Sequence, residues 1–83
     1  MILAPLRTDL RTYLAKHQLT EKWKKVKVLF EQNIRHPSLH TELLEPQWRG
    51  FYSFRLDRKY RAHFFISRTG EAEVFLITNH YKK

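Results

Sequence analysis

Four basic side chains fall within twelve residues in the second half of the chain, in the stretch FRLDRKYRAHFF (54–65). They are Arg55, Arg58, Lys59 and Arg61. The arginine guanidinium binds phosphate through two parallel N–H donors, and paired arginines can stabilise the charge that develops on a phosphoryl group as it is transferred. Basic residues on a strand are more often simply solvated. The pattern alone therefore leaves a phosphate site and a solvated face both open.

Groups that can move protons lie on both sides of this stretch. Glu45 precedes it, and the chain ends in His80, Tyr81, Lys82 and Lys83. A carboxylate, an imidazole and a phenol can each accept or donate a proton. With two arginines they would be sufficient to cleave RNA. A base would take the proton of a 2′-OH, the oxygen would attack the adjacent phosphorus, the arginines would hold the added charge, and an acid would protonate the leaving 5′-oxygen. No metal is needed for these steps.

Other chemistries find less support. His36 and His40 are four residues apart, but Pro37 interrupts any helix between them and no third ligand accompanies them, which favours two loop histidines over a zinc site. No serine stands in a G-x-S-x-G context, and the chain contains no P-loop and no G-x-G-x-x-G. We therefore expect no metal, no serine nucleophile and no nucleotide cofactor.

Length and charge narrow the class of protein. The 83 residues predict one domain spanning 1–83, and 42% hydrophobic residues are enough for a core. Sixteen Lys and Arg against eight Asp and Glu give a net charge of +8, which predicts attraction to polyanions. Nucleic acid leads this class, with an anionic membrane surface and an acidic protein partner as alternatives.

The absence of some sequence features predicts the compartment. The chain has no cysteine, which excludes disulfides and fits a reducing compartment. It has no apolar run of the roughly 20 residues needed to span a bilayer, and its first residues do not resemble a signal peptide. We expect a soluble cytoplasmic protein.

Two helices should precede the sheet that carries the basic stretch. Apolar residues at i, i+4, i+7 and i+8 predict an amphipathic helix over 6–17, with Pro5 in its first turn. A second helix is expected over 21–35, with Thr20 as its N-cap and Pro37 soon after its end. The short link between them favours an antiparallel helical hairpin.

The hydrophobic period then changes to two. Strands are expected over 51–56, 60–66 and 74–79 in an antiparallel meander, and residues 1–4 could add a short fourth strand. The segment 74–79 is nearly all apolar, which predicts a central strand covered on both faces. We therefore expect an α+β fold, in which the helical hairpin packs on an antiparallel sheet of three to four strands.

Alternation also separates the two faces of this sheet. Phe54, Leu56 and Phe64 belong to the more apolar face, which should meet the helices. Arg55 and Arg61 fall on the opposite phase of neighbouring strands. The two arginines are therefore predicted to share the helix-free face.

The segments YSFRLDRKYRAHFFI and EVFLITNHYKK resemble the RelE/ParE superfamily of toxins from type II toxin–antitoxin systems. The loop HPSLHTELLEP is similar to that of plasmid-stabilisation members. The likeness covers about residues 5–83 and lies in the order and spacing of short motifs: two helices, a strand, a turn, a Y-R strand, and a closing strand that ends in H-Y. It implies a RelE-like fold.

Within the superfamily, the closest pattern is that of the YoeB-like ribonucleases. By resemblance, Glu45 would be the base, Arg61 the phosphate stabiliser, His80 the acid and Tyr81 a positioner of RNA, with the choice of proton donor between His80 and Tyr81 left open. The RNA backbone would be held by a further set of cations: Arg55, Arg58, Lys59, Lys82 and Lys83. The implied activity is a ribosome-dependent endoribonuclease, an mRNA interferase that inhibits translation and arrests growth without a cofactor.

The implied partners are an acidic antitoxin, the ribosome and mRNA. Antitoxins of this type are partly disordered and become ordered as they bind. Two alternatives remain open from the residues. The ParE branch of the superfamily inhibits DNA gyrase without cleaving RNA, and an inactive module could retain only nucleic-acid or antitoxin binding.

Overall fold

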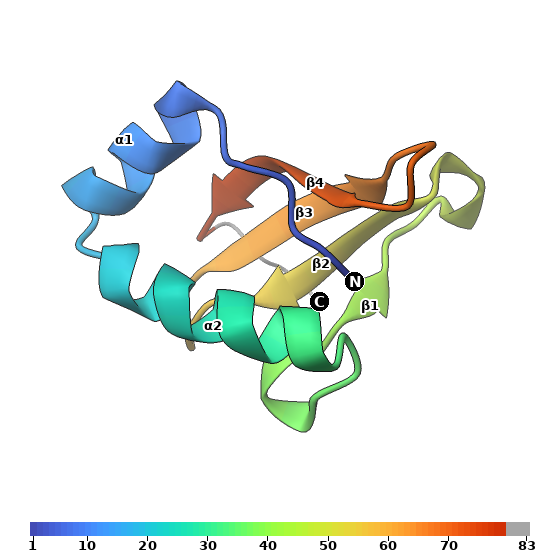
Figure 1. Cartoon of the computed structure of the whole chain (residues 1–83), viewed down its shortest axis with the longest axis horizontal. Helices are drawn as coiled ribbons and strands as arrows, with labels where there is room; N and C mark the ends of the chain where they lie inside the picture. Colours follow the sequence, from blue (N-terminus) through green and yellow to red (C-terminus); the bar gives the residue numbers. More distant parts are fainter. Residues whose placement is uncertain (80–83) are drawn as a thin grey trace.

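The structure, a computed structural model, describes residues 1–79. Two helices come first, followed by a sheet whose first strand lies between two short 3-10 turns (Figure 1). In chain order the elements are α1 (Thr8–Lys16), α2 (Thr20–Gln32), η1 (Pro37–Leu39), β1 (Glu42–Leu43), η2 (Gln47–Arg49), β2 (Phe51–Arg55), β3 (Arg61–Ile66) and β4 (Ala72–Thr78). The predicted α+β class and the three long strands are confirmed.

The four strands form one sheet in the order β1-β2-β3-β4, and every neighbouring pair is antiparallel. The fourth strand is β1 rather than residues 1–4. Those first residues instead run beside β4, where Leu3 forms a single parallel bridge with Ala72. Ala4 N–H donates to the Ala72 carbonyl and Ala72 N–H to the Ile2 carbonyl, both at 2.9 Å.

The prediction that the apolar last strand is central was wrong. β4 lies at one end of the strand order, and β2 and β3 are the central strands. Its core-facing side chains are Ala72, Val74 and Ile77, whereas Glu73 and Leu76 are exposed. An apolar strand can occupy an edge when other segments cover its backbone, and here the first residues of the chain do so.

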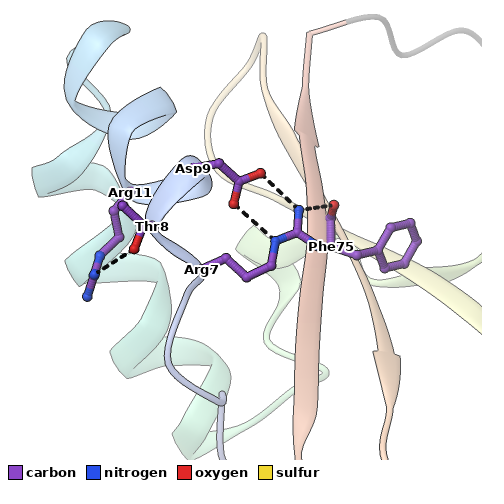
Figure 2. A network of polar contacts seen from close by, with 5 residues as sticks. All are labelled: Arg7, Thr8, Asp9, Arg11 and Phe75. Carbon is purple, nitrogen blue, oxygen red and sulfur yellow. Dashed lines mark hydrogen bonds and ion pairs between the residues drawn. The ribbon is translucent and has the colours of Figure 1, made fainter.

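Arg7 covers a second part of the same edge (Figure 2). Its Nη2 donates to the Phe75 carbonyl at 3.2 Å, and its guanidinium also pairs with Asp9, with Nε 3.0 Å from Oδ1. Asp9 stands in the first turn of α1, so one arginine connects the start of that helix to β4. Arg11 makes a local contact, from Nη2 to Thr8 Oγ1 at 3.4 Å.

The helices pack on the predicted face of the sheet. Phe30 of α2 is fully buried, with its ring centroid 5.0 Å from Phe54 and 5.3 Å from Phe64, and Trp23 lies 6.0 Å from Phe54. These contacts confirm the strand phase, because Phe54 and Phe64 were assigned to the helix side. The core also contains a set of aliphatic residues: Leu3, Leu10, Leu14, Leu19, Leu39, Leu56, Ala62, Ala72, Val74 and Ile77.

The helix ends differ from the predictions by a few residues. Thr20 is the first residue of α2 rather than its N-cap, a position that buried Leu19 occupies without a side-chain bond. Burial of Leu19 in the core therefore outweighs the capping preference of threonine. α2 ends at Gln32, where Asn33 turns extended, and α1 begins after Arg7, so that Pro5 precedes the helix. No helix within residues 1–79 combines the length and the apolar character needed to cross a membrane.

Candidate functional site: a cationic cavity on the helix-free face

Arg61 begins β3 directly opposite Arg55 of β2, which places both residues on the helix-free face as predicted. The two arginines differ in burial. Arg55 is partly exposed, whereas only 7% of Arg61 is accessible to solvent. The predicted neighbours are therefore one anchored arginine and one that solvent reaches.

The guanidinium of Arg61 is held in a fixed orientation. Its Nε donates to Ser53 Oγ at 3.0 Å, and Nη2 donates to the same oxygen at 2.9 Å and to the His40 carbonyl at 2.6 Å. Ser53 is fully buried two residues before Arg55, and its small side chain leaves room for the arginine to lie across it. Burying a charge is costly unless it is hydrogen-bonded, and these bonds reduce that cost.

The His40 carbonyl reaches Arg61 because of the local backbone. His40 caps η1 with φ at 45°, in the left-handed region that non-glycine residues adopt infrequently. The chain leaves this residue for Thr41 and β1, and Thr41 Oγ1 donates to the Ile34 carbonyl at 2.7 Å. The end of the loop after α2 is thus bonded both to Arg61 and to the start of the same loop at Ile34.

A cavity of about 370 Å³ opens beside Arg61. We call it the cationic cavity, because four cations and two carboxylates line it together with one histidine: His40, Glu42, Arg55, Asp57, Arg58, Lys59 and Arg61. All four cations of the stretch 54–65 therefore line one space. Such an excess of positive charge in a concave site attracts phosphate groups.

Asp57 shapes the turn that brings two of these cations to the cavity. Its Oδ1 accepts the backbone N–H groups of Lys59 and Tyr60, each at 2.8 Å, and its Oδ2 accepts Lys22 Nζ at 2.7 Å. Burial acts to raise the pKa of Asp57, but the bonds from Lys22, Lys59 and Tyr60 outweigh it, and the pKa lies below its ordinary value. Asp57 is therefore ionised at neutral pH and orders the residues between β2 and β3.

The sequence analysis missed three residues that line this cavity: Glu42, His40 and Asp57. Glu42 is the one among them that adds a carboxylate from β1. It lies opposite Ser53 in β1 and lines the cationic cavity. The available signal for Glu42 was the two-residue alternation of a strand, in which Glu42 and its neighbour Leu43 point to opposite faces. β1 has only two residues, which is too short for this alternation to be recognised in the sequence. Glu45, the carboxylate predicted as the base, is exposed in the segment between β1 and η2 and is absent from the lining of this cavity.

The remaining predicted residues, His80, Tyr81, Lys82 and Lys83, lie outside the described residues. β4 ends at Thr78, which pairs with Arg61.

His63 adds a titratable group on the same face as Arg61. It pairs with Ser53 in the sheet, and its ring centroid lies 6.2 Å from that of Phe75. Burial first, and the charge of Arg61 second, hold the pKa of His63 below its ordinary value. The imidazole is therefore neutral at physiological pH. Among residues 1–79, no three His, Cys, Asp or Glu side chains gather as a metal-binding group.

Comparison with known proteins identifies the fold. No family model and no curated protein sequence matches the chain. Among solved structures, a YoeB/ParE toxin from Agrobacterium tumefaciens superposes with a TM-score of 0.70 at 19% identity, covering 98% of this chain and 100% of that chain. The YoeB dimer from Staphylococcus aureus superposes with a TM-score of 0.68 at 16% identity, covering 96% and 94%. The resemblance found in the sequence is thus confirmed at the level of structure, and this protein has the fold of the YoeB/ParE toxins.

Proposed function

We propose that this protein is the toxin of a type II toxin–antitoxin pair and acts as a ribosome-dependent endoribonuclease on mRNA. The observation that carries the proposal is the cationic cavity, where Arg55, Arg58, Lys59 and Arg61 meet the carboxylate of Glu42. The fold of the YoeB/ParE toxins and the resemblance of the terminal His80-Tyr81 motif support it.

The cavity suits a phosphodiester that is attacked by its neighbouring 2′-OH. In this proposal Arg61, fixed by Ser53 and His40, holds the phosphoryl oxygens as negative charge grows on them. Arg55, Arg58 and Lys59 bind the flanking phosphates. A guanidinium that is already oriented need not reorganise during the reaction, so its interaction favours the transition state.

The geometry favours Glu42 over Glu45 as the group that takes the 2′-OH proton, because Glu42 lines the cavity. Protonation of the leaving 5′-oxygen falls to His80 or Tyr81, as the resemblance implies. The oxygen of the 2′-OH forms a bond to phosphorus, the bond to the 5′-oxygen breaks, and a 2′,3′-cyclic phosphate and a 5′-hydroxyl result. Every step uses side chains of this chain and none needs a metal.

The partners follow from the charge and the proposed substrate. A surface with a net charge of +8 suits ribosomal RNA, and it equally suits an acidic antitoxin that becomes ordered on binding. The protein would act in the cytoplasm, where messages are translated.

The two carboxylates provide the test. Glu42→Gln and Glu45→Gln remove the same charge three residues apart. In a translation reaction with purified protein, the 5′ ends of the message are mapped over time. We expect wild type to cut within codons, Glu42→Gln to cut at least about 100-fold more slowly, and Glu45→Gln to stay within a few-fold of wild type. Thermal melting of each variant checks that it is folded.

Other outcomes separate the alternatives. Loss of activity only in Glu45→Gln would return the role of base to Glu45, as the resemblance implies. Full activity in both variants would remove both carboxylates from that role. Intact message with wild-type protein would reject the ribonuclease, and accumulation of cleaved gyrase–DNA complexes would then identify a ParE-like activity. Absence of growth arrest on induction, with intact message and intact DNA, would leave only a binding module.

A further inference from the structure

A second cavity, of about 490 Å³, lies beside the cationic cavity. We call it the Tyr52 cavity, and it is lined by Ile34, Arg35, His36, Pro37, His40, Thr41, Glu42, Leu43 and Tyr52. His40 and Glu42 line both cavities. The two spaces therefore meet at the β1 edge of the sheet, with Arg61 on the helix-free side and Tyr52, stacked on Phe64, on the helix side. A ligand that occupies both must pass around that edge.

The two cavities differ in chemistry. Four cations dominate the cationic cavity. The Tyr52 cavity has one arginine, Arg35, and combines the apolar and aromatic side chains of Ile34, Pro37, Leu43 and Tyr52 with the polar ones of His36, His40, Thr41 and Glu42. Leu43 is 38% exposed although it is apolar, and Arg35 is exposed. A cavity that combines apolar and aromatic walls with hydrogen-bonding side chains suits a flat ligand with polar edges.

The aromatic wall is preformed. The Tyr52 ring stacks on Phe64 with centroids 5.3 Å apart and planes 18° apart, so one face of the ring is supported by the core. Tyr52, which is half-buried, is one of the residues that line the cavity. Aromatic rings held in this way are platforms on which nucleobases stack, whatever the base.

The lining residues that follow α2 are also held by hydrogen bonds. Thr41 Oγ1 binds the Ile34 carbonyl at 2.7 Å, and Ser38 N–H donates to His36 Nδ1 at 3.1 Å. Since Nδ1 accepts this bond, the ring proton is on Nε2, which is then a donor for the edge of a base. The Tyr52 ring and the lining residues that follow α2 are thus held in place before any ligand arrives.

We propose that the Tyr52 cavity is a nucleobase subsite. It would hold the base next to the phosphate that the cationic cavity binds, and the RNA strand would pass from one cavity to the other over His40 and Glu42. The inference rests on the proposed function and specifies its substrate as a single-stranded RNA segment. It also places the ribose between the cavities beside Glu42, where a 2′-OH must be to lose its proton.

A cavity-filling variant tests the subsite. Leu43→Trp adds a large ring at a partly exposed edge position of the cavity, and Val28→Trp adds the same ring on α2, where Val28 is 55% exposed and lines neither cavity. Arg35→Gln removes the arginine of the Tyr52 cavity at an exposed position and serves if Leu43→Trp does not fold. Thermal melting establishes folding for all three.

Two probes separate the two cavities. Adenylyl-adenosine with a 2′-O-methyl group carries bases and cannot be cleaved, and ribose 5-phosphate carries a phosphate but no base. Titrations followed by NMR chemical shifts give both dissociation constants. We expect Leu43→Trp to raise the dissociation constant of the dinucleotide about fivefold or more, as loss of one stacked base would. The dissociation constant of ribose 5-phosphate should not change. Arg35→Gln should weaken the dinucleotide by a smaller factor, about threefold, and Val28→Trp should change neither constant.

The contrary results are distinct. Unchanged dinucleotide affinity in both Leu43→Trp and Arg35→Gln, with message cleavage intact, would overturn the subsite and leave the proposed function standing. Protection of the Tyr52 cavity by an acidic peptide, but not by the dinucleotide, would assign it to a protein partner instead. If wild type bound neither probe and cut no message, the proposed function and the subsite would fall together.

Discussion

Arg61 carries a positive charge at a position that is only 7% exposed. Its bonds to Ser53 and to the His40 carbonyl join β3, β2 and the loop after α2. An arginine can do this because its donors form a planar fork, whereas a lysine has one nitrogen on a flexible stem. The same side chain therefore both ties the loop to the sheet and lines the cationic cavity.

A substitution that keeps the charge separates these two roles. Arg61→Lys should lower the free energy of unfolding by about 1–3 kcal/mol, because one ammonium cannot reach both Ser53 Oγ and the His40 carbonyl and a buried acceptor is left unpaired. Urea denaturation measures this difference. Arg55→Lys on the facing strand is the matched control and should change stability by less than about 0.5 kcal/mol. Equal unfolding midpoints for the two variants would show that the Arg61 bonds do not stabilise the fold.

At the scale of elements, the connection from β2 to β3 is ordered by a single carboxylate. Asp57 accepts two backbone N–H groups of its own turn and an ammonium from α2. Tyr60, at the end of this turn, also places its hydroxyl 3.3 Å from His17 Nδ1 at the end of α1. The turn that carries Arg58 and Lys59 is thus fastened to both helices.

The lowered pKa of Asp57 makes this contribution depend on pH. Because the folded pKa lies below the unfolded one, near the ordinary value of 3.8, the stabilisation is fully present above that value and is lost as pH falls through the folded pKa. Asp57→Asn should therefore be about 1–2 kcal/mol less stable than wild type at pH 7, and the gap should shrink below about pH 4. Urea denaturation across this range measures it.

A control isolates the contribution of the ion pair. Asp9 and Glu31 also have lowered pKa values, so their contributions to stability are lost in the same acidic range. Both residues are present in wild type and in Asp57→Asn, so this loss cancels in the comparison. Lys22→Met removes only the ammonium, and it should cost less than Asp57→Asn because the two backbone bonds remain. A stability gap that stays constant with pH would contradict a role for the ionised carboxylate.

At the scale of the whole molecule, charge should govern binding to RNA. For a single strand, the logarithm of the binding constant falls with the logarithm of salt concentration by about 0.7 per phosphate contact. Changing both Arg58→Gln and Lys59→Gln should reduce this slope by about 1.4, as measured by fluorescence anisotropy with a 2′-O-methyl oligonucleotide. Changing Lys16→Gln and Lys25→Gln, exposed positions that line neither cavity, removes the same net charge and should leave the slope nearly unchanged. Similar slopes for the two double variants would indicate attraction by net charge without a defined site.

Local pattern was sufficient to predict the two helices and the three long strands. The 3.6-residue period located both helices, and the two-residue period placed Phe54 and Phe64 on the helix side and Arg55 and Arg61 on the other. The pattern failed where an element was too short to show a period, as in β1, and where burial came from a distant segment. β4 reads as a central strand because it is apolar, but its edge is covered by residues 2–4 and by Arg7, which the sequence places far away.

The sequence by itself therefore determined the α+β class, the strand phase and the side of the sheet on which the two arginines lie. Each of these follows from the spacing of neighbours along the chain. Only the tertiary structure decided that Arg61 is buried, that Glu42 and not Glu45 lines the cationic cavity, and that a second cavity adjoins it. Those features depend on how the loop after α2 folds back onto β2 and β3, through the His40 carbonyl and the Glu42–Ser53 pair. Contacts between residues so far apart leave no periodic trace in the sequence.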